Sequence, residues 1–240
     1  MEMDVIMIRL DKYLSDMGIG TRAEVKKYIR QGRVKLDDQV IKTPEIKLDE
    51  KIQHVFLDGQ AVTYEEYEYY MLHKPAGVVS ATTDVKDKTV IDLITDSKRK
   101  DLFPVGRLDK DTEGLLLITN DGDMAHRLLA PKKHVDKVYY AKVAGIVTQE
   151  DVEIFKKGME IGKGEVAKPS ILKIIYSGEV SEIELTIQEG KFHQVKRMFH
   201  SVGKEVLYLK RISMGSLKLD STLPKGAYRM LTREEVEQLC

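Results

Sequence analysis

Two carboxylates, Asp109 and Asp111, lie beside Arg107 in the polar stretch GRLDKDTEG (residues 106–114), directly before the apolar run 115–119. Such an apolar run predicts a buried strand, so the carboxylates are expected in a loop at the edge of a sheet. The neighbouring arginine favours their ionised forms. An ionised carboxylate can attack an electrophilic carbon or stabilise a developing positive charge, which makes this loop the candidate site of chemistry.

The same spacing is open to three other interpretations. The pattern DxDxEG begins like a calcium-binding loop, but its twelfth position is Asn120, where such loops have a bidentate glutamate. Paired carboxylates also serve glycoside hydrolysis, although the chain has no tryptophan that would form an aromatic sugar platform. The third interpretation, acidic residues that only decorate a turn, is disfavoured by the other motifs of the chain.

The segment GRLDKDTEGLLL (residues 106–117) closely resembles the catalytic signature of pseudouridine synthases that carry an N-terminal S4 domain. Four further segments resemble family motifs in the same order: HKPAG (73–77), KVY (137–139), EGKFHQVKRMF (189–199) and LTREE (231–235). The resemblance implies an enzyme that cleaves the N-glycosidic bond of a uridine in RNA, turns the uracil and rejoins it to the ribose through carbon. Because this reaction gains and loses no atoms, no redox cofactor is expected. No metal is expected either, because the histidines show no metal-ligand pattern.

The resemblance also implies roles for individual side chains. Asp109 is the expected catalytic aspartate, and Tyr139 is expected to stack on the uracil and to help relay a proton. Lys196 occupies the position of a basic residue that pairs with the aspartate, although its neighbour Arg197 is an alternative for that role. Because a stacked uridine must first be flipped out of the RNA, this domain also needs RNA contacts. The candidates are Arg107, His193, Gln194 and Arg197.

The target RNA is predicted from a finer resemblance. Within the family, EGKFHQVKRMF together with the DxDT of the signature is most similar to the bacterial branch that modifies 16S rRNA. Relatives that act on 23S rRNA often have Asn-Arg-Gln or Asn-Arg-Glu where this chain has Phe-His-Gln at 192–194, so a 23S target is the nearest alternative. A non-catalytic RNA-binding or ribosome-assembly factor is the alternative from another class. The intact Asp109, Tyr139 and Lys196 argue against it.

The beginning of the chain predicts a small RNA-binding unit. Thr21 stands three residues before Glu24 in a capping-box pattern, which predicts the start of a helix. The opposite face of that helix carries four cations, whose mutual repulsion favours a polyanionic partner such as phosphate. These cations are Arg22, Lys26, Arg30 and Arg33. The stretch 7–60 resembles the S4 domain, which implies that the first three of them contact RNA.

The chain is expected to form an α+β protein with two domains. We assign residues 1–60 to the S4-like module, 61–66 to a linker and 67–240 to a catalytic domain on a mixed, largely antiparallel sheet. Alternating or apolar segments predict strands over residues 69–72, 115–119, 137–143, 171–176 and 182–188. Apolar periodicity predicts helices over residues 124–129, 149–157 and 194–201.

Composition narrows the class of partner. Lys+Arg and Asp+Glu both number 39 in the 240 residues, but residues 9–35 and 191–211 carry a surplus of positive charge, which indicates a polyanion bound over part of the surface. The one cysteine, Cys240, excludes an internal disulfide and fits a reducing compartment. No apolar run is long enough to cross a membrane. We therefore expect a cytoplasmic monomer with an rRNA substrate and no membrane partner.

Overall fold

The computed structural model describes residues 7–130 and 133–239, so the single cysteine, Cys240, lies outside the described part. None of the helices in this part is both long and apolar enough to cross a membrane.

The chain divides into two compact units. Unit 1 comprises the chain up to Glu68 together with the segment Asp96–Leu102. Unit 2 comprises Tyr69–Thr95 and the chain from Phe103 onward. The chain therefore passes between the two units three times.

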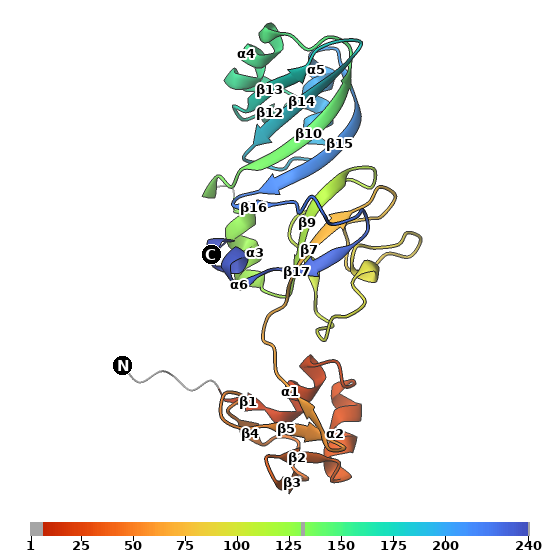
Figure 1. Ribbon diagram of the computed structural model, residues 1–240, viewed down its shortest axis with the longest axis vertical. Helices are drawn as coiled ribbons and strands as arrows, with labels where there is room; N and C mark the ends of the chain where they lie inside the picture. Colours follow the sequence, from red (N-terminus) through yellow and green to blue (C-terminus); the bar gives the residue numbers. More distant parts are fainter. Residues whose placement is uncertain (1–6, 131–132, 240) are drawn as a thin grey trace, which may run out of the picture. The chain divides into compact units, whose positions relative to one another are not determined.

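Unit 1 contains two helices and a four-stranded antiparallel sheet in the order β3-β2-β5-β6, with a separate pair of short strands, β1 and β4 (Figure 1). The predicted capping box is confirmed: the Glu24 N–H donates to the Thr21 hydroxyl, and the Glu24 carboxylate accepts from the Thr21 N–H. The elements are β1 Ile8–Arg9, α1 Leu10–Asp16, α2 Arg22–Arg30, β2 Val34–Leu36, β3 Gln39–Ile41, β4 Lys47–Leu48, β5 Val55–Leu57 and β6 Gln60–Val62.

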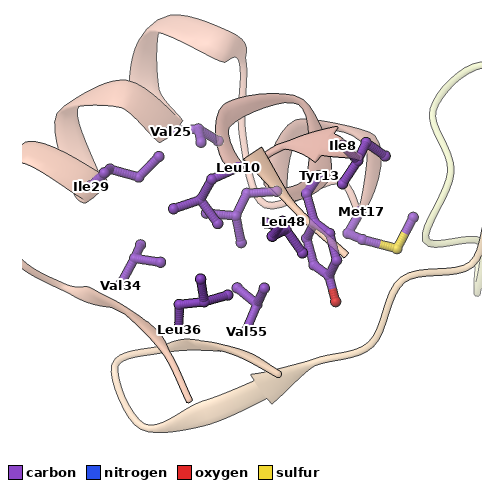
Figure 2. Close-up of a cluster of buried hydrophobic side chains, with 11 residues drawn as sticks. Ile8, Leu10, Tyr13, Met17, Val25, Ile29, Val34, Leu36, Leu48 and Val55 are labelled. Atoms are coloured by element: carbon purple, nitrogen blue, oxygen red, sulfur yellow. The ribbon is translucent and has the colours of Figure 1, made fainter. Parts of the chain in front are cut away.

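The core of unit 1 lies between its helices and its sheet. Figure 2 shows Leu10 and Ile29 of the helices facing Val34 and Leu36 of the sheet, and all four side chains are buried. Burial of each aliphatic side chain contributes about 1.5–3 kcal/mol. Because α2 turns its apolar face inward, its cationic face is left toward solvent.

Two segments of unit 1 depart from the expected boundaries. Tyr64, inside the expected linker 61–66, donates a hydrogen bond to the Asp16 carboxylate at 3.1 Å. Arg99 is buried, and its guanidinium lies 3.5 Å from the same carboxylate. The segment Asp96–Leu102, which contains Arg99, therefore belongs structurally to unit 1, although the sequence analysis assigned it to the catalytic domain.

Unit 2 is built on a nine-stranded mixed sheet (Figure 1). Seven of its strands follow the order β13-β14-β10-β15-β9-β7-β17, and the other two are β16, which pairs with β15, and β8, which pairs with β9. The α+β class and the mixed, largely antiparallel sheet are as predicted. Helix α4 packs along β13, and α5 packs along β15. The elements are β7 Tyr69–Lys74, η1 Ile91–Leu93, β8 Phe103–Pro104, β9 Glu113–Thr119, α3 Gly122–Leu129, β10 Lys137–Ala144, α4 Gln149–Lys157, β11 Met159–Glu160, β12 Val166–Ala167, β13 Ile171–Tyr176, β14 Val180–Ile187, α5 Gln194–Ser201, β15 Glu205–Met214, β16 Leu217–Lys218, β17 Tyr228–Met230 and α6 Arg233–Leu239.

Three neighbouring strands bring the candidate site together. β9 pairs with β15 in parallel, β15 pairs with β10 in antiparallel fashion, and the register sets Gly114, Arg211 and Tyr139 side by side. Gly114 has a φ of +106°, and a Cβ at this position would lie 2.2 Å from the Arg211 carbonyl oxygen. Only glycine therefore permits this close pairing. As a result, the loop that precedes β9 and carries Asp109 ends beside the strands that carry Arg211 and Tyr139.

Alternation and helical periodicity decide which side chains reach the site. In β10, Tyr139 is buried and Tyr140 is half-buried, because successive residues of a strand point to opposite faces. In α5, Met198 and Phe199 are buried in the core. Lys196 lies on another side of the same helix and stays a quarter exposed.

Candidate active site

The loop that carries Asp109 is fixed by hydrogen bonds to the segment that follows β7. The Gly77 N–H donates to the carbonyl oxygen of Lys110 at 2.7 Å. The Ser80 hydroxyl donates to the carbonyl oxygen of Leu108 at 2.8 Å and accepts from the N–H of the same residue at 3.1 Å. The backbone on both sides of Asp109 is therefore held, while its side chain stays 26% exposed.

A buried lysine at the end of β7 holds the backbone of this loop. Lys74 has an exposed fraction of 0%, and its ammonium group donates to four carbonyl oxygens. The acceptors belong to Pro75 at 3.1 Å, Asp109 at 3.0 Å, Lys110 at 3.3 Å and Thr112 at 2.8 Å. Two of these acceptors, the carbonyl oxygens of Asp109 and Lys110, also accept a backbone N–H, from Thr112 and Gly77. The ammonium group therefore adds a shared donor that holds the four carbonyl groups together. Burial lowers the pKa of Lys74 to about 8, and the nearby carboxylates oppose this shift.

Lys196 lies between the two carboxylates of the loop. Its ammonium group donates to both carboxylate oxygens of Asp111, at 2.6 and 2.8 Å, and lies 3.5 Å from the Asp109 carboxylate. The hydrogen bond from Lys196 lowers the pKa of Asp111. The expected proximity of Lys196 to Asp109 is thus observed, but the shorter bonds go to Asp111, the second carboxylate of the loop, to which the resemblance gave no separate role.

Arg197 points away from the carboxylates. Its guanidinium donates to the carboxylate of Glu165 and to the carbonyl oxygens of Ile161, Gly162 and Phe192. These acceptors tie α5 to neighbouring loops. Of the two basic neighbours that the sequence analysis considered as partners of the aspartate, only Lys196 lies beside Asp109. The RNA contact expected of Arg197 stays a prediction.

Asp109, Tyr139 and Lys196 line the same pocket of unit 2, together with Arg107, His193 and Leu209. Tyr139 is 7% exposed and lies on the strand next to that of Leu209, so the two side chains give the pocket an apolar wall. Arg107 is exposed and is part of the pocket lining. A carboxylate, an ammonium group and an aromatic ring around one pocket suit a small, planar, polar ring such as a nucleobase.

The turn before α5 separates the roles of two candidate residues. His193 begins the helix in the left-handed conformation, with a φ of +48°, and its Nε2 lies 3.7 Å from the Asp109 carboxylate. Gln194 is buried: its amide nitrogen donates to Glu189 at 2.8 Å, and its amide oxygen accepts from the Lys191 N–H at 2.9 Å. Gln194 therefore shapes the turn, and His193 is the one of the two with an exposed side chain beside Asp109.

The cationic face of α2 in unit 1 is partly neutralised. Lys26 lies 3.6 and 3.4 Å from two carboxylates, and Arg33 is paired with Asp58. Arg22 and Arg30 are exposed, and neither has an ion-pair partner within the described part of the chain. Of the three RNA contacts expected in this unit, Arg22 and Arg30 therefore remain available to a phosphate, whereas Lys26 is held by the protein.

Among the residues that the structure describes, no group of three or more His, Cys, Asp and Glu side chains is placed to hold a metal ion.

The fold and the pocket define a class of two-domain RNA-modifying enzymes. Residues 68–201 match the family of RNA pseudouridylate synthases, and residues 8–51 match the S4 domain. The chain belongs to the RNA pseudouridine synthase family and is an isomerase that converts uridine in RNA to pseudouridine. The predicted enzyme class and the predicted S4 domain are thereby confirmed.

Several full-length relatives are similar to this chain. An uncharacterized RNA pseudouridine synthase of Bacillus subtilis is 47% identical over 97% of this chain and 98% of the relative. The ribosomal small subunit pseudouridine synthase A of Vibrio cholerae is 41% identical over 97% of this chain and 99% of the relative. The ribosomal large subunit pseudouridine synthase B of Bacillus subtilis is 39% identical over 97% and 96% of the two chains. All three relatives are named pseudouridine synthases, and the two whose names give a ribosomal subunit give different ones.

Proposed function

We propose that this enzyme converts a specific uridine of 16S rRNA to pseudouridine, with Asp109 as its catalytic carboxylate. The observation that carries the proposal is the common pocket of Asp109, Tyr139 and Lys196, which come from a loop, a strand and a helix that are far apart in the sequence. Folding brings them together around a space suited to a nucleobase.

The chemistry follows from the charges that the reaction develops. Cleavage of the N-glycosidic bond leaves the anomeric carbon of the ribose electron-poor, and Asp109 attacks that carbon or stabilises its charge. Tyr139 stacks on the detached uracil while it turns, and its hydroxyl helps to relay the proton that leaves the ring carbon joined to the ribose. Lys196 orients the two carboxylates and balances their charge. Arg107, at the pocket, helps to hold the target uridine outside the RNA stack.

The choice of 16S rRNA has two supports. The relative of Vibrio cholerae that is named for the small subunit is 41% identical to this chain along nearly its full length. In addition, residues 192–194 read Phe-His-Gln instead of the Asn-Arg-Gln or Asn-Arg-Glu of many enzymes that act on 23S rRNA. The relative named for the large subunit is 39% identical, so 23S rRNA is the second candidate.

Pseudouridine mapping tests the target directly. Transcripts of small-subunit and large-subunit rRNA, and the corresponding protein-bound subunit particles, are incubated separately with pure enzyme and no added cofactor. We expect one new pseudouridine in the small-subunit RNA. A new pseudouridine confined to large-subunit RNA would keep the reaction and replace the target. No modification of any of the four substrates would contradict the proposal.

We further propose that unit 1 grips RNA while unit 2 performs the isomerisation. Reversing the two exposed cations, as Arg22→Glu with Arg30→Glu, is expected to raise KM at least about tenfold and to leave kcat within about twofold. The salt dependence of RNA binding should weaken by about one unit of log Kd against log salt for each cation lost. Lys26 is left unchanged, because its reversal would also break its contacts with two carboxylates.

A matched reversal in unit 2 provides the control. Lys156 and Lys157 are exposed at the end of α4, and Lys156→Glu with Lys157→Glu changes the net charge by the same amount. We expect this variant to retain most of the wild-type affinity and salt dependence. Equal losses in both double variants would show that RNA responds to the net charge and not to the α2 face.

The proposal also includes the oligomeric state, the cellular location and the cofactor requirement of the enzyme. The candidate pocket is formed by residues of a single chain, which supports action as a monomer. An rRNA substrate places the enzyme in the cytoplasm, and isomerisation calls for no cofactor. Sedimentation of the pure protein with and without RNA tests the monomer.

A further inference from the structure

An aromatic pair stands beside the active-site pocket, and the proposed chemistry does not use it. The rings of Phe192 and His193 are stacked, with their centroids 3.8 Å apart and their planes 16° from parallel. Phe192 is 72% exposed, which is unusual for a phenylalanine. His193 lines the pocket, and its Nε2 lies 3.7 Å from the Asp109 carboxylate. One ring of the pair therefore belongs to the pocket, and the other is open to solvent.

The turn that presents the pair is held from two sides. The Lys191 N–H donates to the side-chain oxygen of Gln194 at 2.9 Å, and Arg197 donates to the carbonyl oxygen of Phe192 at 3.2 Å. His193 keeps a left-handed backbone conformation, which is uncommon for a residue other than glycine. Such conformations persist where the surrounding structure enforces them and concentrate at ligand-binding sites. The backbone that presents the exposed ring is thus held, although the ring contributes little to the core.

The reaction supplies a ligand for such a ring. A uridine becomes accessible only after it leaves the RNA stack, and this leaves the faces of adjacent bases uncovered. Proteins bind unstacked bases on aromatic rings, because every base offers a π face. Phe192 offers an exposed ring at the edge of the pocket that must take the target uridine, while its stacking partner His193 lies close to Asp109.

We propose that Phe192 and His193 form a stacking platform for an unpaired RNA base next to the target uridine. The proposal rests on the proposed function in that it takes a uridine flipped into the Asp109 pocket as given. It adds that one neighbouring nucleotide also leaves the stack and lies on Phe192. Phe192 is then a positioning residue for the RNA substrate.

Steady-state kinetics give the first test. Phe192→Leu keeps an apolar side chain but removes the ring, and we expect KM to rise about tenfold with kcat within about twofold of wild type. Phe192→Tyr should restore KM, because tyrosine also stacks. Tyr176 is an exposed aromatic residue on β13, away from the pocket lining, so Tyr176→Leu should leave both constants unchanged.

Fluorescence gives a test that needs no turnover. The chain contains no tryptophan, so Phe192→Trp introduces a single probe at the platform. In an Asp109→Asn background, small-subunit rRNA transcript should quench this fluorescence as a base stacks on the indole. The same RNA should leave the fluorescence of Tyr176→Trp, in the same background, nearly unchanged.

The outcomes separate the platform from the proposed function. Unchanged fluorescence of the Phe192→Trp variant, with RNA binding confirmed by filter retention, would overturn the platform. A fall in kcat at constant KM for Phe192→Leu would also overturn it, because Phe192 would then act by supporting His193 beside Asp109. If wild-type enzyme modifies neither rRNA, the proposed function fails, and the quenching experiment still decides whether RNA stacks on Phe192.

Discussion

The Asp109→Asn variant is expected to lose pseudouridine formation while it retains RNA affinity within about twofold. Asparagine keeps the shape of the side chain but cannot form an ester with the ribose or neutralise a full positive charge. We expect kcat to fall at least about 10³-fold, which corresponds to about 4 kcal/mol of lost transition-state stabilisation. Affinity should persist because an aspartate repels phosphate and its removal costs no RNA contact. Quantitative pseudouridine mapping and filter binding measure the two effects separately.

The Asp111→Asn variant is the most informative comparison with Asp109→Asn. Asp111 takes both short hydrogen bonds of Lys196, yet its side chain is 71% exposed. If Asp109 is the catalytic carboxylate and Asp111 only orients Lys196, Asp111→Asn should lower kcat by about tenfold and no more. The reverse order, with an inactive Asp111→Asn variant and an active Asp109→Asn variant, would transfer the catalytic role to Asp111.

Local patterns predicted much of the fold, because local interactions determine the elements concerned. Thr21 and Glu24 form the capping box that their spacing indicates, since both partners lie within one helical turn. The helices expected over residues 149–157 and 194–201 begin and end where the apolar periodicity places them. In β10, Tyr139 and Tyr140 lie on opposite faces of the sheet, because a strand has a period of two.

Lys74 shows what the sequence could not predict. Its acceptors are backbone carbonyl oxygens, which every residue carries, so nothing in the amino-acid pattern identifies them. Arg197 was ambiguous for the same reason, because three of its four acceptors are carbonyl groups. The segment Asp96–Leu102 belongs to unit 1 through contacts with residues far away in the sequence, which no local pattern indicates. The one available signal for Lys74 was its place in the HKPAG motif, which the resemblance matched without giving it a role.

The loop that carries Asp109 thus has two sets of contacts, one with the Asp109 side chain and one with the backbone. Lys196 and His193 lie next to the carboxylate of Asp109 and interact with it electrostatically. Lys74 and Ser80 bind the backbone beneath it and bear on its position. Because a shift of about 1 Å in a catalytic group can cost about 10²-fold in rate, the second set should matter for turnover although it touches no substrate.

The Lys74→Met variant is therefore expected to lose both stability and activity. Methionine preserves the apolar stem but removes a donor to four carbonyl groups, three of them in the loop that carries Asp109. Those of Asp109 and Lys110 keep a backbone N–H donor, so the loss bears mainly on the carbonyl groups of Pro75 and Thr112. A buried acceptor left without a partner costs about 1–3 kcal/mol, and removal of a buried charge offsets part of the sum. We expect the free energy of unfolding to fall by about 3 kcal/mol and kcat to fall by about 10²-fold or more in the fraction that remains folded. Denaturant unfolding and single-turnover kinetics measure these quantities.

Lys110 provides the matched control, because it lies in the same loop and its half-exposed side chain is paired with Asp87 at the surface. Lys110→Met removes the same charge through the same substitution, but an exposed ion pair contributes about 1 kcal/mol or less. If Lys74 acts through the backbone of the loop, only Lys74→Met should unfold at clearly lower denaturant concentration and lose turnover with little change in RNA affinity. Equal and small effects of the two substitutions would mean that the loop keeps the position of Asp109 without the buried ammonium group, and Lys74 would then have no positioning role.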